Sequence, residues 1–165
     1  MSDVFDAAKR SQVMSRIRGR GNLSTELRLV AAFREHRIVG WRRHVLMRPR
    51  VASVDSRPVS LQQRISVRPD FMFRHQRVVV FVDGCFWHGC PKHFNIPVSN
   101  VEFWTKKLTG NVRRDARATT TLQAAGWKVL RVWEHEMAHV EVVIKRVRLL
   151  LDSGEESDCQ QMPHS

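Results

Sequence analysis

Apolar side chains in the middle of the chain predict a β-hairpin. Residues Val78 to Asp83 form a run of β-branched and aromatic side chains without polar alternation, which is typical of a strand buried on both faces. Arg68 to Phe73 begins a second strand, and residues 74–77 form a polar turn between the two. We therefore expect residues 70–83 to fold as an antiparallel hairpin.

The flanking patterns predict one further strand on each side and several helices. Val39 to Leu46 is consistent with an edge strand anchored by Trp41, and Trp127 to Trp133 alternates as a strand does. Helical spacing of apolar residues predicts helices at 24–36, 101–108, 112–125 and 140–151.

Capping residues and glycines set the expected helix ends. Ser24 is a candidate N-cap of the first helix, whose apolar stripe is formed by Leu23, Leu27, Val30 and Ala31 and widened by Leu29 and Phe33. Residues 109–111, Thr-Gly-Asn, are expected to break the second helix, with Asn111 capping the third. Gly126 is expected to end that third helix.

Charge and length narrow the class of protein. The 165 residues carry 28 Lys and Arg against 16 Asp and Glu, a formal net charge of +12. A basic, arginine-rich chain favours a polyanion such as DNA as partner, although a basic surface without function has the same composition. The sequence shows no apolar stretch long enough to cross a membrane, and it shows no signal peptide. We therefore expect a cytoplasmic protein.

The expected organisation is a single α/β domain over residues 1–151, a length sufficient for a hydrophobic core. Residues 1–22 read as an arginine-rich arm that could contact DNA phosphates or simply be a frayed terminus. Residues 47–67 lack periodicity and predict a long loop insertion or hairpin. The acidic tail at 152–165 is expected to be disordered.

Two carboxylates are expected at one end of the hairpin. Asp70 begins the first strand and Asp83 ends its antiparallel partner, so their side chains should lie near the same end of the sheet. Paired acids there could share Mg²⁺, which prefers oxygen ligands and phosphate oxygens. Two solvated acids at the hairpin end are the simpler explanation of the spacing alone.

A cluster of cysteine and histidine follows directly. Cys85, Cys90 and His93 offer two thiolates and an imidazole within nine residues, and His135 follows the 127–133 strand. Three local ligands and one distant ligand are the arrangement of structural zinc. His88, His139 and Cys159 compete with His135 as the fourth ligand, and two buried cysteines with surface histidines are the non-metal alternative.

The residues resemble those of a known family. The chain is similar, in order from about Arg10 to Glu134, to the very short patch repair endonucleases of bacteria, the Vsr family. The motifs that carry the resemblance are Arg68-Pro-Asp-Phe71, Asp83-Gly-Cys-Phe-Trp-His-Gly-Cys-Pro-Lys-His93, Glu102-Phe-Trp104, Asn111-Val-Arg-Arg-Asp115 and Gly126-Trp-Lys-Val-Leu-Arg-Val-Trp-Glu134.

The resemblance implies a fold and an activity. The implied fold is a mixed central sheet flanked by helices, related to the PD-(D/E)xK restriction endonucleases, with cysteine at position 85 in place of the usual lysine. The implied enzyme is a monomer with two catalytic Mg²⁺ ions and one structural Zn²⁺ that nicks double-stranded DNA 5′ of the thymine in a T·G mismatch. Such mismatches arise by deamination of 5-methylcytosine, and other repair proteins would be its partners.

The resemblance also implies roles for individual residues. Asp70 and the carbonyl of Val82 would bind Mg²⁺, and Glu26 would lie near its waters. His88 would be the general acid or base, supported by Asp115. The remaining implied roles are zinc binding by Cys85, Cys90, His93 and His135, and DNA contacts by Met14, Phe86, Trp87, Trp104, Asn111 and the arginines at 16, 18 and 20 (Arg16, Arg18, Arg20).

Two departures and two alternative functions remain. Cysteine stands in some family members where this chain has His135, and residues 47–67 are longer than the usual connector. The alternatives are a PD-(D/E)xK nuclease with another DNA target and a non-catalytic DNA-binding module stabilised by zinc. For Phe86 and Trp87, core packing is the alternative to contact with DNA.

Overall fold

A four-stranded mixed sheet lies at the centre of the computed structural model, which describes residues 25–49, 65–98 and 100–153. Its strands, in spatial order, are β1 (Trp41–Arg43), β2 (Phe71–Phe73), β3 (Val78–Asp83) and β4 (Lys128–Trp133). The first two pairings are antiparallel, which confirms the predicted hairpin and edge strand, although β1 is shorter than expected. β3 and β4 are parallel.

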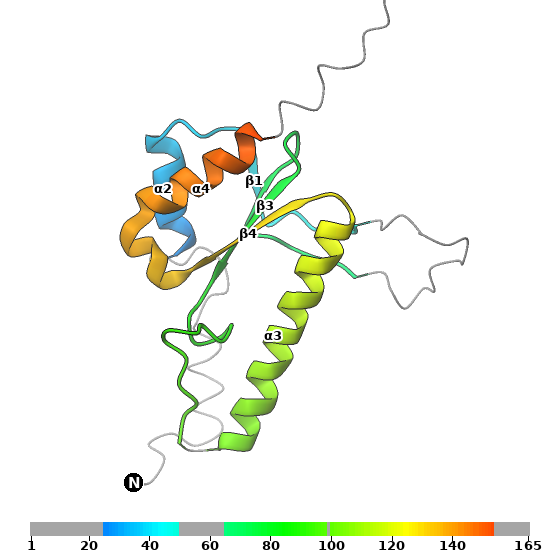
Figure 1. The fold of residues 1–165 in the computed structure, drawn as a ribbon, viewed down its shortest axis with the longest axis vertical. Helices are drawn as coiled ribbons and strands as arrows, with labels where there is room; N and C mark the ends of the chain where they lie inside the picture. Colours follow the sequence, from blue (N-terminus) through cyan, green and yellow to red (C-terminus); the bar gives the residue numbers. More distant parts are fainter. Residues whose placement is uncertain (1–24, 50–64, 99, 154–165) are drawn as a thin grey trace, which may run out of the picture.

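Helices cover both faces of this sheet. The described helices are α2 (Glu26–Glu35), α3 (Val101–Ala124), the 3₁₀ helix η2 (Glu134–His139) and α4 (Val140–Asp152). α2 and α4 lie together on one side, whereas the long α3 connects β3 to β4 and extends beyond the end of the sheet (Figure 1). None of these helices combines the length and apolar content needed to cross a bilayer.

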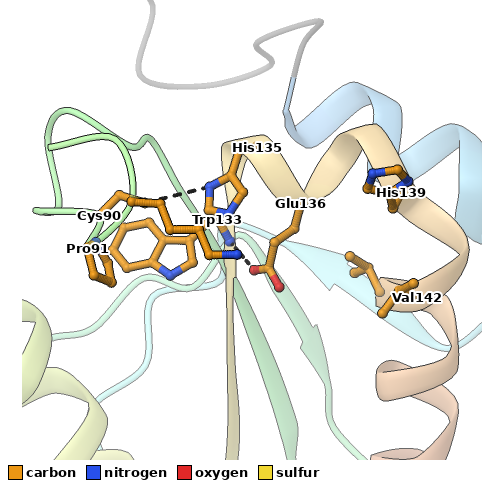
Figure 2. Close-up of a pocket in the computed structure, with 9 residues that line it drawn as sticks. Cys90, Pro91, Trp133, His135, Glu136, His139 and Val142 are labelled. Atoms are coloured by element: carbon orange, nitrogen blue, oxygen red, sulfur yellow. Dashed lines mark hydrogen bonds between the residues drawn. The ribbon is translucent and has the colours of Figure 1, made fainter.

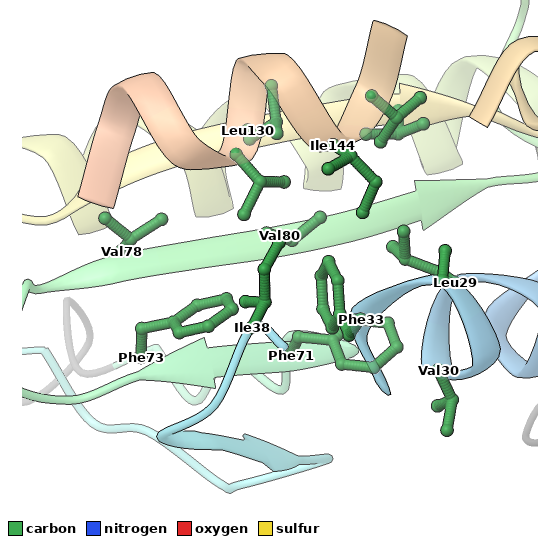
Figure 3. Packing of buried hydrophobic residues seen from close by; sticks show 14 of the residues in the cluster. Leu29, Val30, Phe33, Ile38, Phe71, Phe73, Val78, Val80, Leu130 and Ile144 are labelled. Atoms are coloured by element: carbon green, nitrogen blue, oxygen red, sulfur yellow. The ribbon is translucent and has the colours of Figure 1, made fainter. Parts of the chain in front are cut away.

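The larger core lies between the sheet and helices α2 and α4 (Figure 3). Phe33 of α2 is fully buried, and its ring meets the edges of Phe71 and Phe73 at centroid distances of 5.1 and 5.7 Å. Offset and edge-to-face pairs of this kind add to the free energy of apolar burial. Val78 and Val80 of β3 continue the same face.

A smaller core lies on the opposite face, beneath α3. Val79 and Met72 pack there with Leu122 of α3 and with Met47 and Val67. Val78, Val79 and Val80 all have no exposed surface, so the prediction that this strand is buried on both faces is confirmed.

The predicted helix break at residues 109–111 is wrong. α3 runs continuously for 24 residues through Gly110. A glycine inside a helix costs only about 1 kcal/mol relative to alanine, and buried Leu108 and Leu122 anchor α3 on either side of it. Asn111 is therefore no N-cap: its side-chain amide donates a hydrogen bond of 2.9 Å to the carbonyl of Trp87.

The first helix was placed correctly, and Leu29, Val30 and Phe33 of its predicted apolar stripe are buried. Ala31, which was also predicted to face the core, is exposed, and Ala32 is buried instead. Thr25 occupies the N-cap position without a side-chain hydrogen bond. Predictions for the 1–22 arm, Ser24, Cys159, most of the 47–67 insertion and nearly all of the acidic tail lie outside the described residues.

Removing the ring of Phe33 tests the larger core. We expect Phe33→Ala to lower the free energy of unfolding by about 3–5 kcal/mol, since it leaves a cavity beside Phe71 and Phe73. The exposed Phe103, at 56 %, provides the control, and Phe103→Ala should change stability by no more than about 0.5 kcal/mol. Urea unfolding measures both; equal losses would contradict the packing described.

Candidate active site and metal centre

A group of acidic and imidazole side chains lies where α2, β1 and β2 meet. Glu26, His44 and Asp70 each present a ligand atom within 4.8 Å of the others. His44 Nε2 lies 2.9 Å from the Glu26 carboxylate, and Arg43 donates to the same oxygen at 2.6 Å. Because both carboxylates and the imidazole converge, this group has the ligand chemistry of a divalent-cation site.

Asp70 has an unusual environment in this group. Burial raises the pKa of its carboxyl from 3.8 to about 6, and the negative charges of Glu26 and Asp83 add to the effect. The backbone amide of Val82 opposes this rise by donating a hydrogen bond of 2.7 Å. A carboxylate that is costly to ionise without a cation is well suited to bind one.

His88 and Asp115 form a close pair next to this group. Nδ1 of His88 lies 2.6 Å from Oδ2 of Asp115. Burial lowers the pKa of His88, but the hydrogen bond to Asp115 and the charges of Asp83 and Asp115 outweigh it, so its pKa lies above the usual value. Because an ionised carboxylate only accepts, Nδ1 carries the proton and Nε2 is the nitrogen that can exchange a proton with a substrate.

Asp83 belongs to a second ion pair rather than to the group around Asp70. Both of its oxygens accept hydrogen bonds from Arg131, at 2.6 and 2.7 Å, and its side chain is almost completely buried. The guanidinium also lies 3.1 Å from Asp115. The two acids do lie near one end of the hairpin, as predicted, but the charge of Asp83 is balanced by Arg131.

Four soft and borderline ligands gather at the end of β3. Nδ1 of His135 lies 3.2 Å from Sγ of Cys85 and 3.6 Å from Sγ of Cys90, and Nδ1 of His93 lies 3.7 Å from Sγ of Cys90. Zn–S bonds of about 2.3 Å and Zn–N bonds of about 2.0 Å place tetrahedral ligand atoms roughly 3.3–3.8 Å apart. The cluster therefore has the composition and spacing of a structural zinc site.

The competing fourth ligands are arranged differently. His88 is engaged with Asp115, and His139 lies at the end of η2, outside the group that Cys85, Cys90, His93 and His135 form. The structure thus brings His135, and not His88 or His139, to the two thiols.

The segment from Cys85 to Cys90 is held on two sides. Its backbone closes on itself through the Cys90 amide and the Cys85 carbonyl at 3.0 Å, and Asn111 of α3 binds the Trp87 carbonyl. Gly89 has a φ of +69°, and a Cβ there would lie 3.1 Å from the side chain of Val112. Glycine is therefore needed both for the turn and for the close approach of α3.

The aromatic side chains predicted to meet DNA form one cluster. Phe86 stands edge-on to Trp87 and Trp104, with centroid distances of 5.0 and 5.4 Å. Phe86 and Trp87 are partly exposed, but Trp104 is 7 % exposed and lies beneath them. The cluster stands beyond the end of the sheet, where α3 extends.

A hollow of about 350 Å³ borders the Cys and His cluster, and Figure 2 shows residues that line it. Cys90, His135, Trp133 and Glu136 contribute to its wall, and Glu136 accepts a hydrogen bond from the Trp133 amide. Glu26, Asp70, His88 and Asp115 take no part in it.

Sequence reasoning missed three residues of the site. Arg43 and His44 follow Trp41 in the edge strand, and the pattern alone does not show that this strand reaches Glu26. Arg131 carried a usable signal, because it is a charged residue at a core-facing position of a predicted strand and so requires a counter-charge.

Comparison with known proteins identifies the family of this chain. A family model described as DNA mismatch endonuclease Vsr matches residues 57–94, which include Asp70, His88 and three members of the Cys and His cluster. Type II nicking enzyme V.NmeAIP of Neisseria meningitidis serogroup A is 31 % identical over 153 residues, covering 92 % of this chain and 95 % of that protein. The chain belongs to the Vsr endonuclease family.

Shorter stretches of the Vsr-family chain match two other relatives more strongly. Type II nicking enzyme V.NaeI of Lentzea aerocolonigenes is 51 % identical over 72 residues, or 44 % of this chain and 43 % of the relative. DNA mismatch endonuclease Vsr of Escherichia coli K12 is 47 % identical over 68 residues, or 41 % of this chain and 44 % of the relative. These two matches cover less than half of each relative.

Metal analysis and substitution of a cysteine test the Cys and His cluster. We expect one Zn²⁺ per chain by elemental analysis, and we expect Cys90→Ser to lower the melting temperature sharply or prevent folding, because structural zinc contributes on the order of 10 kcal/mol to folding. His139→Gln, outside the cluster, is the matched control and should retain the metal. A stable preparation free of zinc would contradict the assignment.

The raised pKa of Asp70 predicts a pH-dependent stability. Its folded-state pKa exceeds its unfolded value, so its contribution to stability is fully present below about 3.8 and is lost as the pH rises through about 6. Without Mg²⁺, Asp70→Asn should therefore be more stable than wild type at pH 7, by up to about 3 kcal/mol.

The advantage of Asp70→Asn should shrink as the pH falls toward 4.5, as followed by urea unfolding in buffers without Mg²⁺. Asp152→Asn, at the exposed end of α4, should show no such trend. A stability difference that does not vary with pH would mean that burial does not disfavour the ionised Asp70.

Proposed function

We propose that this protein is a Mg²⁺-dependent DNA endonuclease that nicks one strand 5′ of the thymine in a T·G mismatch, as in very short patch repair in the bacterial cytoplasm. The observation that carries the proposal is the joint placement of the Glu26, His44 and Asp70 group beside the His88–Asp115 pair. The relatives named as mismatch and nicking endonucleases support the same reaction class.

Asp70 and the carbonyl of Val82 are the proposed direct ligands of Mg²⁺, with Glu26 holding its waters. Two ions at this position would offset the negative charge that builds on the phosphate and increase the acidity of a bound water. The residues fit this role, since Asp70 is buried among negative charges and gains most from a cation. Asp83 supports the site through its proximity to His88, 3.5 Å away, rather than as a direct ligand.

His88 is the proposed acid–base group. Its Nδ1 is fixed by Asp115, so the imidazole presents Nε2 toward the substrate. Nε2 can take a proton from the attacking water or give one to the leaving 3′ oxygen. Asp115 holds the ring orientation and stabilises the imidazolium that forms.

Recognition of the mismatch is assigned to the aromatic cluster and the basic surface. Phe86 and Trp87, which are partly exposed, would enter the opened base step, and Trp104 would support them from below. Unstacking costs a few kcal/mol per step and least at a weakened pair, which favours T·G over T·A. The proposed contacts from the N-terminal arm are Met14, Arg16, Arg18 and Arg20.

Zinc and Asn111 would shape the segment that carries His88 and Trp87. Both residues lie between Cys85 and Cys90, and Asn111 binds the Trp87 carbonyl. The proposed zinc site, held by Cys85, Cys90, His93 and His135, thereby fixes a catalytic and a DNA-contacting residue together. We propose a monomer with a restriction-endonuclease-like fold, acting on double-stranded DNA together with other repair proteins.

A nicking assay tests this proposal. Wild-type protein with Mg²⁺ should nick a T·G duplex and leave T·A and C·G duplexes of the same sequence intact. Asp70→Ala should abolish nicking while retaining binding to T·G DNA, and His88→Ala should nick about 10²–10⁴-fold more slowly. Asp152→Ala, which removes an exposed carboxylate at the last residue of α4, is the control and should nick normally.

The outcomes separate the alternatives. Equal nicking of all three duplexes would indicate a nuclease with another target. Binding without nicking by the wild-type protein would indicate a DNA-binding module. Nicking by Asp70→Ala would refute the proposed Mg²⁺ ligand.

A further inference from the structure

Arg131 of β4 connects two acidic residues that come from different elements. Its Nε and Nη2 donate to the two oxygens of Asp83 at 2.6 and 2.7 Å, and Nη2 lies 3.1 Å from Oδ1 of Asp115 on α3. Its guanidinium also lies over the ring of Phe81, 4.9 Å from the centroid. A planar guanidinium matches this forked arrangement, whereas a lysine ammonium does not.

The contacts of Arg131 influence which of the two carboxylates accepts the hydrogen bond from His88. Nδ1 of His88 lies 2.6 Å from Oδ2 of Asp115 and 3.5 Å from Oδ1 of Asp83. One N–H can make a strong hydrogen bond to one of these acceptors. Arg131 donates to both oxygens of Asp83 but approaches only Oδ1 of Asp115, so Oδ2 of Asp115 is the less engaged acceptor, and His88 lies closest to it.

Loss of Arg131 would make Asp83, rather than Asp115, the favoured hydrogen-bond acceptor for His88. Asp83, almost completely buried in β3, would become an ion without its guanidinium partner, which is strongly unfavourable. Nδ1 of His88 lies 3.5 Å from Oδ1 of Asp83, and a movement of the imidazole by less than about 1 Å would bring the two to the distance of a strong hydrogen bond. Such a movement also displaces Nε2 from its position toward the substrate.

We propose that Arg131 is a positioning residue for nicking. By forming an ion pair with Asp83, it keeps the imidazole of His88 hydrogen-bonded to Asp115. This inference rests on the proposed function, in which His88 is the acid–base group. A purely structural role, in which Arg131 only stabilises the packing of β3, β4 and α3, predicts reduced stability without any change at His88.

Four proteins distinguish these roles: wild type, Arg131→Gln, Asp83→Asn and the double variant with both changes. Arg131→Gln removes the guanidinium from Asp83 and should lower kcat by about 10- to 100-fold, in line with the order of 10² expected for a misplacement of 1 Å. KM for the T·G duplex should stay within about twofold of the wild-type value, because neither Arg131 nor Asp83 is a proposed DNA contact.

The double variant is the decisive one. The two carboxamides that it introduces are neutral and can still form hydrogen bonds with each other, so position 83 no longer carries a charge that competes for His88. We expect the double variant to regain at least about tenfold in kcat over Arg131→Gln. Arg131→Lys keeps the charge but not the fork, and its kcat should lie between those of wild type and Arg131→Gln.

NMR of His88 gives a readout that does not depend on nicking. In wild type, the Nδ1 proton should resonate far downfield because of its 2.6 Å hydrogen bond, and its assignment follows from its loss in His88→Gln. The resonance should shift in Arg131→Gln and return in the double variant. Melting temperatures, measured with zinc present, show whether each variant is folded under assay conditions.

The results decide the proposal in either direction. It is overturned if Arg131→Gln leaves both the His88 resonance and kcat unchanged, or if the double variant is as slow as Arg131→Gln. If the wild-type protein does not nick T·G DNA, the proposed function fails, while the NMR comparison still shows whether Arg131 sets the position of His88. If Arg131→Gln does not fold, Arg131→Lys and the double variant supply the same comparison.

Discussion

Parallel pairing of β3 with β4 is the interaction on which the Cys and His cluster and the Asp83–Arg131 ion pair both depend. The six register pairs from Val78↔Lys128 to Asp83↔Trp133 bring two segments of the chain that are about fifty residues apart into one plane. Cys85 follows the end of β3 and His135 follows the end of β4, so the same register closes the Cys and His cluster. It also sets Arg131 beside Asp83. A shift of one residue would turn these side chains to the other face and remove both contacts.

Local sequence patterns were sufficient for most elements of the fold. The unbroken apolar run of Val78 to Val80 correctly indicated a strand buried on both faces, and the hairpin followed from the polar turn after Phe73. The two thiols and His93 lie close together in the sequence, so their gathering could be anticipated from spacing. The continuity of α3 could not, because tertiary anchoring by Leu108 and Leu122 outweighs the local preference of Gly110.

The site was less accessible to sequence reasoning because its charges are paired across elements. Asp70 and Asp83 look equivalent in the sequence, yet one lies with Glu26 and His44 and the other is bound on both oxygens by Arg131. That difference is created by α2, β1 and β4, none of which is adjacent to either acid in the chain. Residue spacing could suggest two acids at one end of the sheet, but not which of them would keep its charge available.

The isolated bridge between Met47 and Val67 has a consequence for how this family can vary in length. Their backbones exchange hydrogen bonds of 2.7 and 2.9 Å, so the chain re-enters the fold at the point where it left. Asp70 follows Val67 by three residues, and its position is set by this β-bridge and by β2. Because closing a longer loop costs free energy only logarithmically with length, residues can be added between the two partners at little thermodynamic cost. The Met47–Val67 bridge thus separates variation in chain length from the geometry of the Asp70 carboxylate, so that added residues can acquire new contacts during evolution without displacing Asp70.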